Sequence, residues 1–315
     1  MTRVAVYGSG AVGGYFGGRL AEAGEEVAFL ARGAQLDAIR REGLHVSSIA
    51  GDFSIHPARV EDDPAAIGTV DAVLVAVKAW QLPEAAVAMR PLVGPDTVVV
   101  PLGNGVEAPA LLSEALGARC VAGGYCRILA WVEAPGRIKH AGVDPYIAFG
   151  ELDGARSDRL EALRAAFARA RGVRVDIPSD IRAAMWDKFL FIAAWSGVGS
   201  LTRVPIGVLR AIPETRALLR SALREICGVA AARGIALPAE SADRVLAYFD
   251  TLPPDATTSM QRDVVAGRPS ELEAQMGAVV RLGESAGADV ALHRTMHAAL
   301  LPLESLARGE RPLPS

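Results

Sequence analysis

The chain has 315 residues, of which 51% are apolar, and it carries a formal net charge of -3 with a sequence pI near 6.0. This length allows two domains with separate cores, and the apolar content excludes a disordered chain. Because there is no basic excess, the charge gives no support to a nucleic-acid partner or an anionic membrane surface, and we expect a small-molecule function.

The sequence contains no apolar segment that predicts a membrane span. Its strongest apolar run, Phe189 to Trp195, is far shorter than the ~20 residues of a spanning helix, and the first residues lack the apolar core of a signal peptide. The cysteines Cys120, Cys126 and Cys227 show neither C-x-x-C nor zinc-like spacing. We expect a cytoplasmic protein with reduced thiols and without a metal site.

The first motif is a short apolar strand followed by a glycine-rich turn. Residues 3–14 read R-V-A-V-Y-G-S-G-A-V-G-G, so Gly8, Gly10 and Gly13 fill the glycine positions of G-x-G-x-x-G. These glycines permit a tight turn, close approach of a pyrophosphate, and close packing of the following helix, expected over Tyr15–Ala23. The N–H groups at the start of that helix would face the phosphates. The predicted dinucleotide site consists of Gly8, Ser9, Gly10, Ala11, Val12 and Gly13.

The second predicted strand, Glu26 to Ala31, indicates which dinucleotide binds. An acidic residue at its end would hold the ribose of NAD, but the sequence has Arg32 there. A guanidinium suits the ribose 2'-phosphate of NADP, whereas the alternative is a solvated loop arginine. We therefore expect NADP, in its reduced form NADPH, as the cofactor.

Two further apolar runs are typical of buried parallel strands. Asp71 to Val77 ends at Lys78, and Thr97 to Val100 leads into a glycine-flanked loop that contains Asn104. Since parallel strands present their carboxyl ends at one edge, Lys78 and Asn104 should reach the same ligand-binding edge as Gly8. A solvated lysine at a strand end is the alternative for Lys78.

Alternating strands and helices fill the rest of the first half. The sequence predicts a helix over Ala34–Arg41, extended pieces within His45–Ile55, short strands over Cys120–Cys126, Ile128–Val132, Arg137–His140 and Tyr146–Phe149, a helix over Arg156–Arg171 and a strand over Val173–Asp176. Pro135-Gly136 and Gly142 supply turns between the short strands. The pattern predicts an α/β domain with a Rossmann-type, doubly wound sheet over residues 1–177.

The second half, residues 178–315, predicts an all-helical domain. It follows a linker at residues 177–180 and opens with a helix from Ile181 to about Trp195, in which Lys188 stands directly before a solid apolar run. Lys188 has two interpretations. Its stem can cover apolar surface while the ammonium reaches water, or partial burial can lower its pKa and prepare it to donate a proton.

Two patterns near the C-terminus have structural explanations. Ser270 and Glu273 fit a capping box, which makes Glu271 an acid in a first helical turn. His293 and His297 are spaced i, i+4, but no third ligand with zinc-like spacing stands near them. We expect these histidines to form a surface pair.

Together, these segments resemble the 2-dehydropantoate 2-reductases, also called ketopantoate reductases. The resemblance covers essentially the whole chain. Its motifs are G-S-G-A-V-G-G, L-A-R-G with Arg32, V-K-A-W with Lys78, G-N-G-V with Asn104, W-D-K-F with Lys188, and T-S-M-Q-R-D followed by Glu271.

The resemblance implies an N-terminal Rossmann domain that binds NADPH, a C-terminal helical domain, and a substrate cleft between them. Lys188 would be the general acid that protonates the ketone, and Glu271 would act with it on the substrate hydroxyl. Lys78 and Asn104 would line the nicotinamide and substrate, with Glu271 also near the cofactor. Ser259 would contact the substrate carboxylate.

One departure concerns the substrate. The family usually presents asparagines one and two turns after the lysine, where this chain has Ile192 and Ser196. Ser196 remains a candidate substrate contact, but isoleucine offers no hydrogen bond. The expected reaction is reduction of a 2-keto acid, with 2-dehydropantoate of pantothenate and coenzyme A biosynthesis first and a more apolar 2-keto acid as the alternative.

Two other functions stay open at this point. A hydroxyacid dehydrogenase of the wider 6-phosphogluconate-dehydrogenase type also combines a Rossmann and a helical domain, but the T-S-M to Glu271 segment disfavours it. A non-catalytic NADP-binding sensor needs only the phosphate loop, so Lys78, Asn104 and Lys188 disfavour it. The sequence leaves both a monomer and a homodimer open.

Overall fold

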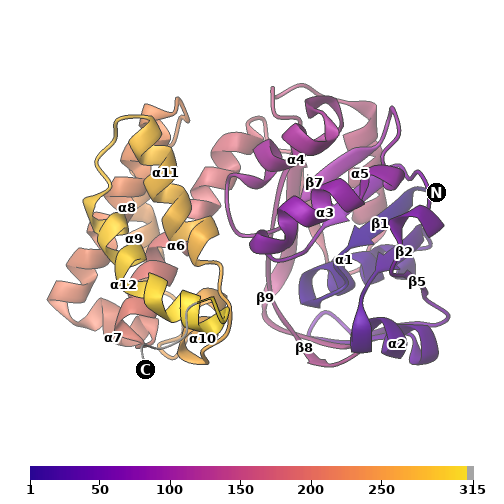
Figure 1. Cartoon of the computed structure of the whole chain (residues 1–315), viewed down its shortest axis with the longest axis horizontal. Helices are drawn as coiled ribbons and strands as arrows, with labels where there is room; N and C mark the ends of the chain where they lie inside the picture. The colour runs from indigo at the N-terminus through magenta and orange to yellow at the C-terminus, as the bar shows by residue number, and fades with distance from the viewer. Residues whose placement is uncertain (311–315) are drawn as a thin grey trace. The chain divides into compact units, whose positions relative to one another are not determined.

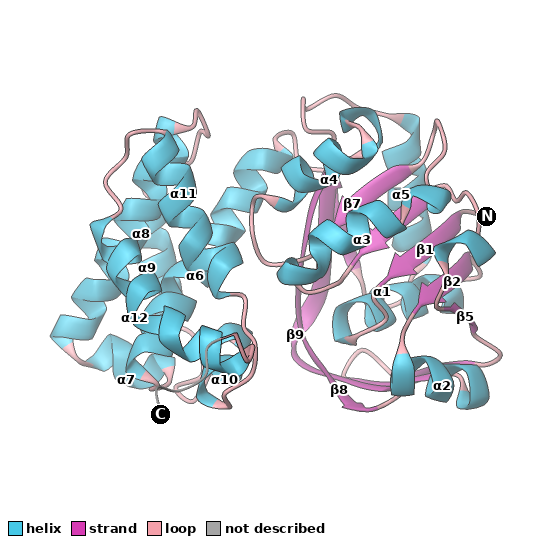
Figure 2. Cartoon of the chain, viewed as in Figure 1, coloured by secondary structure: helices cyan, strands magenta, loops and turns pink. Residues whose placement is uncertain are grey.

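The chain folds into two compact units in a computed structural model that describes residues 1–310 (Figure 1). The first unit comprises Met1–Gly103 and Ala108–Ile181, and the second comprises Asn104–Glu107 and the chain from Arg182 onward. Within the described residues, every strand belongs to the first unit, whereas the second is built of helices (Figure 2). The segment Asn104–Glu107, which the sequence assigns to the first domain, groups by its contacts with the second unit.

A five-stranded parallel sheet forms the centre of the first unit. Its order is β5-β2-β1-β6-β7, which ranks the strands 3-2-1-4-5 along the chain and confirms the predicted Rossmann-type sheet. The strands are β1 (Arg3–Tyr7), β2 (Glu26–Leu30), β5 (Arg59–Glu61), β6 (Ala72–Val75) and β7 (Val98–Pro101). The sequence did not predict β5, because three residues with one apolar side chain give no periodicity.

Helices cover both faces of this sheet. Alternate residues of a strand point to opposite faces, so Val4 and Val6 of β1 pack with α1, whereas Ala5 and Tyr7 pack in the core that holds α3 and α4. The helices of the unit are α1 (Ala11–Glu22), α2 (Gly33–Glu42), α3 (Leu82–Ala88), α4 (Ala108–Leu116) and α5 (Asp158–Arg169).

A second sheet lies against the outer side of α1. Its order is β10-β9-β3-β4, with β8 paired to β9. The strands are β3 (Leu44–Ser48), β4 (Phe53–Ile55), β8 (Gly123–Ala134), β9 (Arg137–Gly150) and β10 (Arg174–Asp176). The expectation of four short strands between residues 120 and 149 is wrong, because β8 and β9 form one long antiparallel hairpin. Gly142, with φ of +79°, lies inside β9 at a register shift and not at a turn.

Helix α1 is packed on both sides. A methyl group on Gly17 would lie 2.5 Å from Cγ2 of Val6 in the parallel sheet, and one on Gly18 would lie 2.7 Å from Cε2 of Phe53 in the second sheet. The helix therefore has no room for side chains on either face at these positions. The glycines facing the parallel sheet are Gly13 and Gly17, and those facing the second sheet are Gly14 and Gly18.

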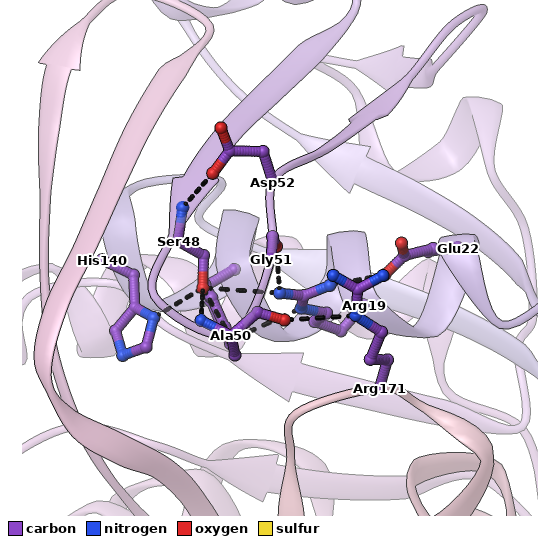
Figure 3. A network of polar contacts seen from close by, with 9 residues as sticks. Arg19, Glu22, Ser48, Ala50, Gly51, Asp52, His140 and Arg171 are labelled. Carbon is purple, nitrogen blue, oxygen red and sulfur yellow. Dashed lines mark hydrogen bonds and ion pairs between the residues drawn. The ribbon is translucent and has the colours of Figure 1, made fainter.

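A buried arginine ties α1 to the turn between β3 and β4 (Figure 3). The side chain of Arg19 is inaccessible to solvent, and its guanidinium donates to the carbonyl of Gly51 at 2.6 Å and to the carboxylate of Glu22 at 2.7 Å. Beside it, the hydroxyl of Ser48 lies 2.8 Å from Nδ1 of His140 in β9. These bonds satisfy the buried charge and fix the second sheet against α1.

The second unit is a bundle of helices around a separate core. It contains α6 (Ile181–Thr202), α7 (Ile206–Ala211), α8 (Pro213–Ala232), α9 (Ser241–Phe249), α10 (Ser259–Val265), a π-helical turn (Glu273–Gly277), α11 (Ala278–Ser285) and α12 (Ala291–Ala307). Helix α6 runs two turns beyond the predicted end at Trp195, because its residues stay buried as far as Ser200 and need no polar face. No helix within residues 1–310 is both long and apolar enough to cross a membrane.

The predicted capping box at Ser270 and Glu273 is wrong. The hydroxyl of Ser270 donates to the carboxylate of Glu304 on α12 at 2.5 Å, and its N–H binds the same carboxylate. The carboxylate of Glu273 instead binds Arg281 at 2.9 Å and His297 at 2.6 Å. Partners on distant elements therefore replace the local contact that the sequence spacing predicted.

The predicted surface pair of histidines is also wrong. His293 is fully buried, and its Nδ1 lies 2.6 Å from the carboxylate of Glu225 on α8. Although burial opposes it, hydrogen bonds from His293 and from two backbone N–H groups hold the pKa of Glu225 below its usual range. Glu225 thus accepts the N–H groups of Leu292 and His293 in the first turn of α12, whose own N-cap residue, Val290, has no side-chain oxygen.

Replacing Gly17 with alanine should destabilise the first unit. The added methyl overlaps Val6, and overpacking of this kind costs about 1–3 kcal/mol. Gly228 of α8 is the matched control, because no described atom lies within 4 Å of a methyl group there, and Gly228→Ala should stabilise the protein by about 0.5–1 kcal/mol. Urea unfolding measures both effects. Equal stability of the two variants would show that α1 is not confined between the sheets.

Candidate functional site

The turn between β1 and α1 has the backbone geometry of a phosphate-binding loop. Gly8 has φ of +99°, and a Cβ on Gly13 would collide with the carbonyl oxygen of Gly8, so both positions require glycine. Gly10 differs, because no described atom lies within 4 Å of a Cβ placed there. The open side of Gly10 and the unpaired N–H groups at the start of α1 fit a dinucleotide pyrophosphate. The first helical residues, both partly exposed, are Ala11 and Val12.

Ser9 is fixed within the loop by its neighbours. It is almost fully buried, and its N–H and hydroxyl both donate to the carbonyl of Leu30, each at 3.1 Å. Its carbonyl accepts a 2.8 Å hydrogen bond from Nε2 of Gln35 on α2, whose Oε1 accepts the N–H of Gly136 at 2.9 Å. Gln35 therefore connects the glycine loop to the turn of the β8–β9 hairpin. The sequence did not reveal this role, because no motif marks Gln35.

Arg32 stands at the end of β2 and is paired with an acid. Its side chain is 68% exposed, and Nη1 lies 3.3 Å from Oε1 of Glu84 in the first turn of α3. Tyr7, the last residue of β1, is close to both side chains. Burial raises the pKa of the Tyr7 hydroxyl, Arg32 opposes this rise, and Glu84 adds to it. The predicted 2'-phosphate position therefore contains a carboxylate as well as a guanidinium.

Lys78 lies at the same edge of the sheet. It follows β6 and precedes a short 3-10 turn (Ala79–Gln81), with its Nζ 5.7 Å from the ring centre of Trp80. Since β1, β2 and β6 are parallel neighbours, Gly8, Arg32 and Lys78 all follow the carboxyl ends of their strands. This is the edge at which doubly wound sheets bind ligands.

In the second unit, Lys188 lies in a partly desolvated position on α6. It is half-buried, and the nearby aromatic side chains of Trp186 and Phe189 are buried. Ile192, one turn later, is also half-buried, whereas Ser196 is completely buried and its hydroxyl has no partner among residues 1–310. The spacing of Lys188, Ile192 and Ser196 places them along one side of the helix, as predicted.

Asn104 and Glu271 come together within the second unit. Nδ2 of Asn104 donates to Oε2 of Glu271 at 3.2 Å, and the carboxylate side chain is almost fully buried. Main-chain packing supports this contact, because a Cβ on Gly105 would lie 3.2 Å from the carbonyl oxygen of Ala274. Ser259 is half-buried at the start of α10, directly after its N-cap Thr258.

The π-helical turn after Glu271 packs closely against α6. A Cβ on Gly197 would lie 2.6 Å from the sulfur of Met276, so this methionine side chain packs directly on the α6 backbone. The contact brings the helix that carries Lys188 close to the segment that carries Glu271. Next to Met276, Gln275 is fully buried, and neither end of its amide has a partner among the described residues. No sequence motif marks Gln275.

The described residues provide no cluster of three or more His, Cys, Asp or Glu side chains that could hold a metal ion. The first unit provides N–H donors, the exposed guanidinium of Arg32 and a lysine ammonium group, which suit binding of phosphates. The second unit provides a lysine ammonium group, an amide and a buried carboxylate, which suit binding of a small organic acid and transfer of a proton.

Comparison with known families gives matches over most of the chain. Residues 4–154 match the family described as "Ketopantoate reductase PanE/ApbA", and residues 180–304 match its C-terminal counterpart, "Ketopantoate reductase PanE/ApbA C terminal". The two matches together cover the parallel sheet, the hairpin and nearly all of the helical unit.

Individual proteins give the same relationship. The chain is 31% identical to the uncharacterized oxidoreductase YkpB of Bacillus subtilis, with 84% of this chain and 87% of that protein covered. It is 30% identical to a 2-dehydropantoate 2-reductase of Mesorhizobium japonicum, with 89% and 91% covered. Among solved structures, the 2-dehydropantoate 2-reductase of Geobacter metallireducens superposes with a TM-score of 0.89 at 30% identity, over 95% of this chain and 99% of that chain.

Replacing Gln35 with leucine should weaken binding of the nicotinamide dinucleotide, with NADPH as the probe. The variant loses both hydrogen bonds that hold the glycine loop, and a net loss of about 1 kcal/mol corresponds to roughly fivefold weaker binding. Calorimetric titration measures this, and Asp37→Leu, on the exposed face of the same helix, controls for leucine on α2. If both variants bind NADPH as the wild type does, the loop does not depend on Gln35.

Proposed function

This chain belongs to the ketopantoate reductase family, and on that basis we propose that it uses NADPH to reduce 2-dehydropantoate, a 2-keto acid, to the 2-hydroxy acid pantoate. Its relatives make it an oxidoreductase of the nicotinamide-dependent type. The observation that carries the proposal is the hydrogen bond between Asn104 and Glu271. It joins two motifs that the chain shares with the family and that are far apart in the sequence.

The residues of the first unit would bind the cofactor. The N–H groups at the start of α1 would hold the pyrophosphate, and Arg32 would bind the 2'-phosphate. Lys78, at the neighbouring strand end, would lie toward the nicotinamide and the substrate. When bound, the dihydronicotinamide supplies a hydride, that is, a proton with two electrons, to the carbonyl carbon.

The residues of the second unit would act on the substrate. As the carbonyl carbon accepts the hydride, negative charge develops on its oxygen, and the ammonium of Lys188 stabilises this charge and donates a proton from Nζ. Lys188 then recovers a proton from water. Lys188 is half-buried on α6 and stands in the W-D-K-F motif that carries the lysine in the family pattern, and this supports the role.

Binding contacts would orient the substrate for this step. The carboxylate of Glu271, held by Asn104, would accept a hydrogen bond from the substrate hydroxyl, and the hydroxyl of Ser259 would donate to the substrate carboxylate. Ser196 requires a change of side-chain packing before it could contact substrate, because it is fully buried.

Replacing Lys188 with methionine should abolish turnover and retain NADPH binding. Loss of a general acid typically lowers kcat by about 10²–10⁴, and methionine keeps an apolar stem of similar length at this half-buried position. NADPH oxidation with 2-dehydropantoate measures turnover, and calorimetry measures binding. Lys139→Met, on the exposed hairpin, is the control. A Lys188→Met enzyme with the wild-type rate would contradict the assignment of Lys188 as the general acid. A wild-type enzyme that does not oxidise NADPH with 2-dehydropantoate would contradict the proposed substrate.

A more apolar 2-keto acid is the second candidate substrate, and Ile192 favours it. Isoleucine one turn after Lys188 replaces a polar contact with apolar surface. Ile192→Asn should therefore raise kcat/KM for 2-dehydropantoate by roughly fivefold or more relative to 2-ketoisovalerate, which lacks the hydroxyl, because about 1 kcal/mol is gained by one hydrogen bond. A parallel assay of both substrates checks this. An unchanged ratio would remove Ile192 from the specificity of the site.

A further inference from the structure

At the sheet edge proposed to bind the cofactor, a distant segment of the chain supplies the carboxylate that is missing from the end of β2. A dinucleotide-binding strand that ends in Asp or Glu holds the ribose hydroxyls of NAD, and β2 ends in Leu30 with no acid after it. Glu84 comes from α3, far along the chain, and brings Oε1 to 3.3 Å from Nη1 of Arg32. Both groups are well exposed, at 72% and 68% of their side chains, and are open to a ligand.

The position of Glu84 is set by the strands beneath it. Helix α3 follows β6, and β6 and β2 are the two parallel neighbours of β1, so the start of α3 and the end of β2 lie at one edge of the sheet. Tyr7, at the end of β1, is electrostatically coupled to both Arg32 and Glu84. The acid–arginine pair therefore stands directly beside the glycine loop, which begins at Gly8.

A 2'-phosphate bound to Arg32 would meet this carboxylate. The phosphate carries about 1.5 to 2 negative charges near neutral pH, as phosphate monoesters do, and it would both compete with Glu84 for the guanidinium and be repelled by it. The 2'-hydroxyl of NADH has no such conflict, because a carboxylate is a good acceptor for a hydroxyl. Glu84 beside Arg32 would thus lower the affinity for NADPH and raise the affinity for NADH.

We propose that Glu84 is a specificity-determining residue that lowers the affinity for NADPH by competing for Arg32 and raises the affinity for NADH by accepting the ribose 2'-hydroxyl. The wild-type enzyme then uses both dinucleotides with a modest preference for NADPH. This inference rests on the proposed function, since it refines which nicotinamide cofactor the same site accepts.

Direct binding tests the proposal without any keto acid. Calorimetric titrations with NADPH and with NADH are carried out on the wild type and on Glu84→Gln. We expect about threefold tighter binding of NADPH and about threefold weaker binding of NADH, a shift of roughly tenfold in their ratio, as the energies of exposed charge pairs allow. The gain for NADPH should shrink at high salt.

Two further variants make the outcome specific. Glu114→Gln is the control, because it removes an equal charge near the end of α4. This helix leads to Ala118 and Arg119, which lie beside the amino ends of the strands, opposite to the cofactor edge. The variant should therefore leave both affinities unchanged. In an Arg32→Gln background, Glu84→Gln should tighten NADPH binding much less, because there is no guanidinium to release and only the repulsion of the phosphate by Glu84 is relieved. Tightening of the same size in that background would overturn the competition for Arg32.

Other results would also overturn the proposal. Weaker NADPH binding by Glu84→Gln would mean that Glu84 merely positions Arg32, and equal shifts for both dinucleotides, or none, would remove its role in discrimination. These results would leave the proposed reductase function standing. A wild type that binds neither dinucleotide would overturn that function and this inference together, whereas failure to turn over 2-dehydropantoate would not affect the binding result.

Discussion

The fold of the first unit depends on the confinement of α1 between two sheets. Helices of a doubly wound domain usually have one face in solvent, but α1 packs on the parallel sheet through one glycine pair and on the second sheet through another. The buried Arg19 then ties it to the β3–β4 turn. Because the N–H groups proposed to bind the pyrophosphate are the first groups of this helix, their position is set by packing on both sides rather than by the loop alone.

The second unit also brings its candidate residues together by close packing. The side chain of Met276 in the π-helical turn packs directly on Gly197 of α6, so the Lys188 helix and the Glu271 segment lie against each other. π-helical turns occur frequently at functional sites. This contact involves a flexible methionine side chain, whereas the glycines of α1 face buried side chains of both sheets.

The sequence predicted the parts of this architecture that depend on local pattern. The glycine turn, the buried strands and the predominantly apolar α6 follow from spacing and composition, and the family follows from motifs such as G-N-G-V around Asn104. The errors concern contacts between distant segments. Ser270 binds Glu304 instead of Glu273, His293 binds Glu225, and Gly142 lies within a long strand, and no periodicity in one segment reveals a partner in another. Gln35 and Glu84 were missed for the same reason.

The candidate cofactor site combines two kinds of residue with different physical constraints. The loop glycines and Gln35 are held by packing and by paired hydrogen bonds, so changing them disturbs the fold around α1. Arg32 and Glu84 are exposed, and an exposed ion pair contributes only about 0–1 kcal/mol to stability. A substitution in this pair can therefore alter the choice of cofactor at little cost to folding. In the proposed site, affinity for the shared part of the two dinucleotides would come from the buried framework, and discrimination between NADPH and NADH would come from the exposed Arg32–Glu84 pair.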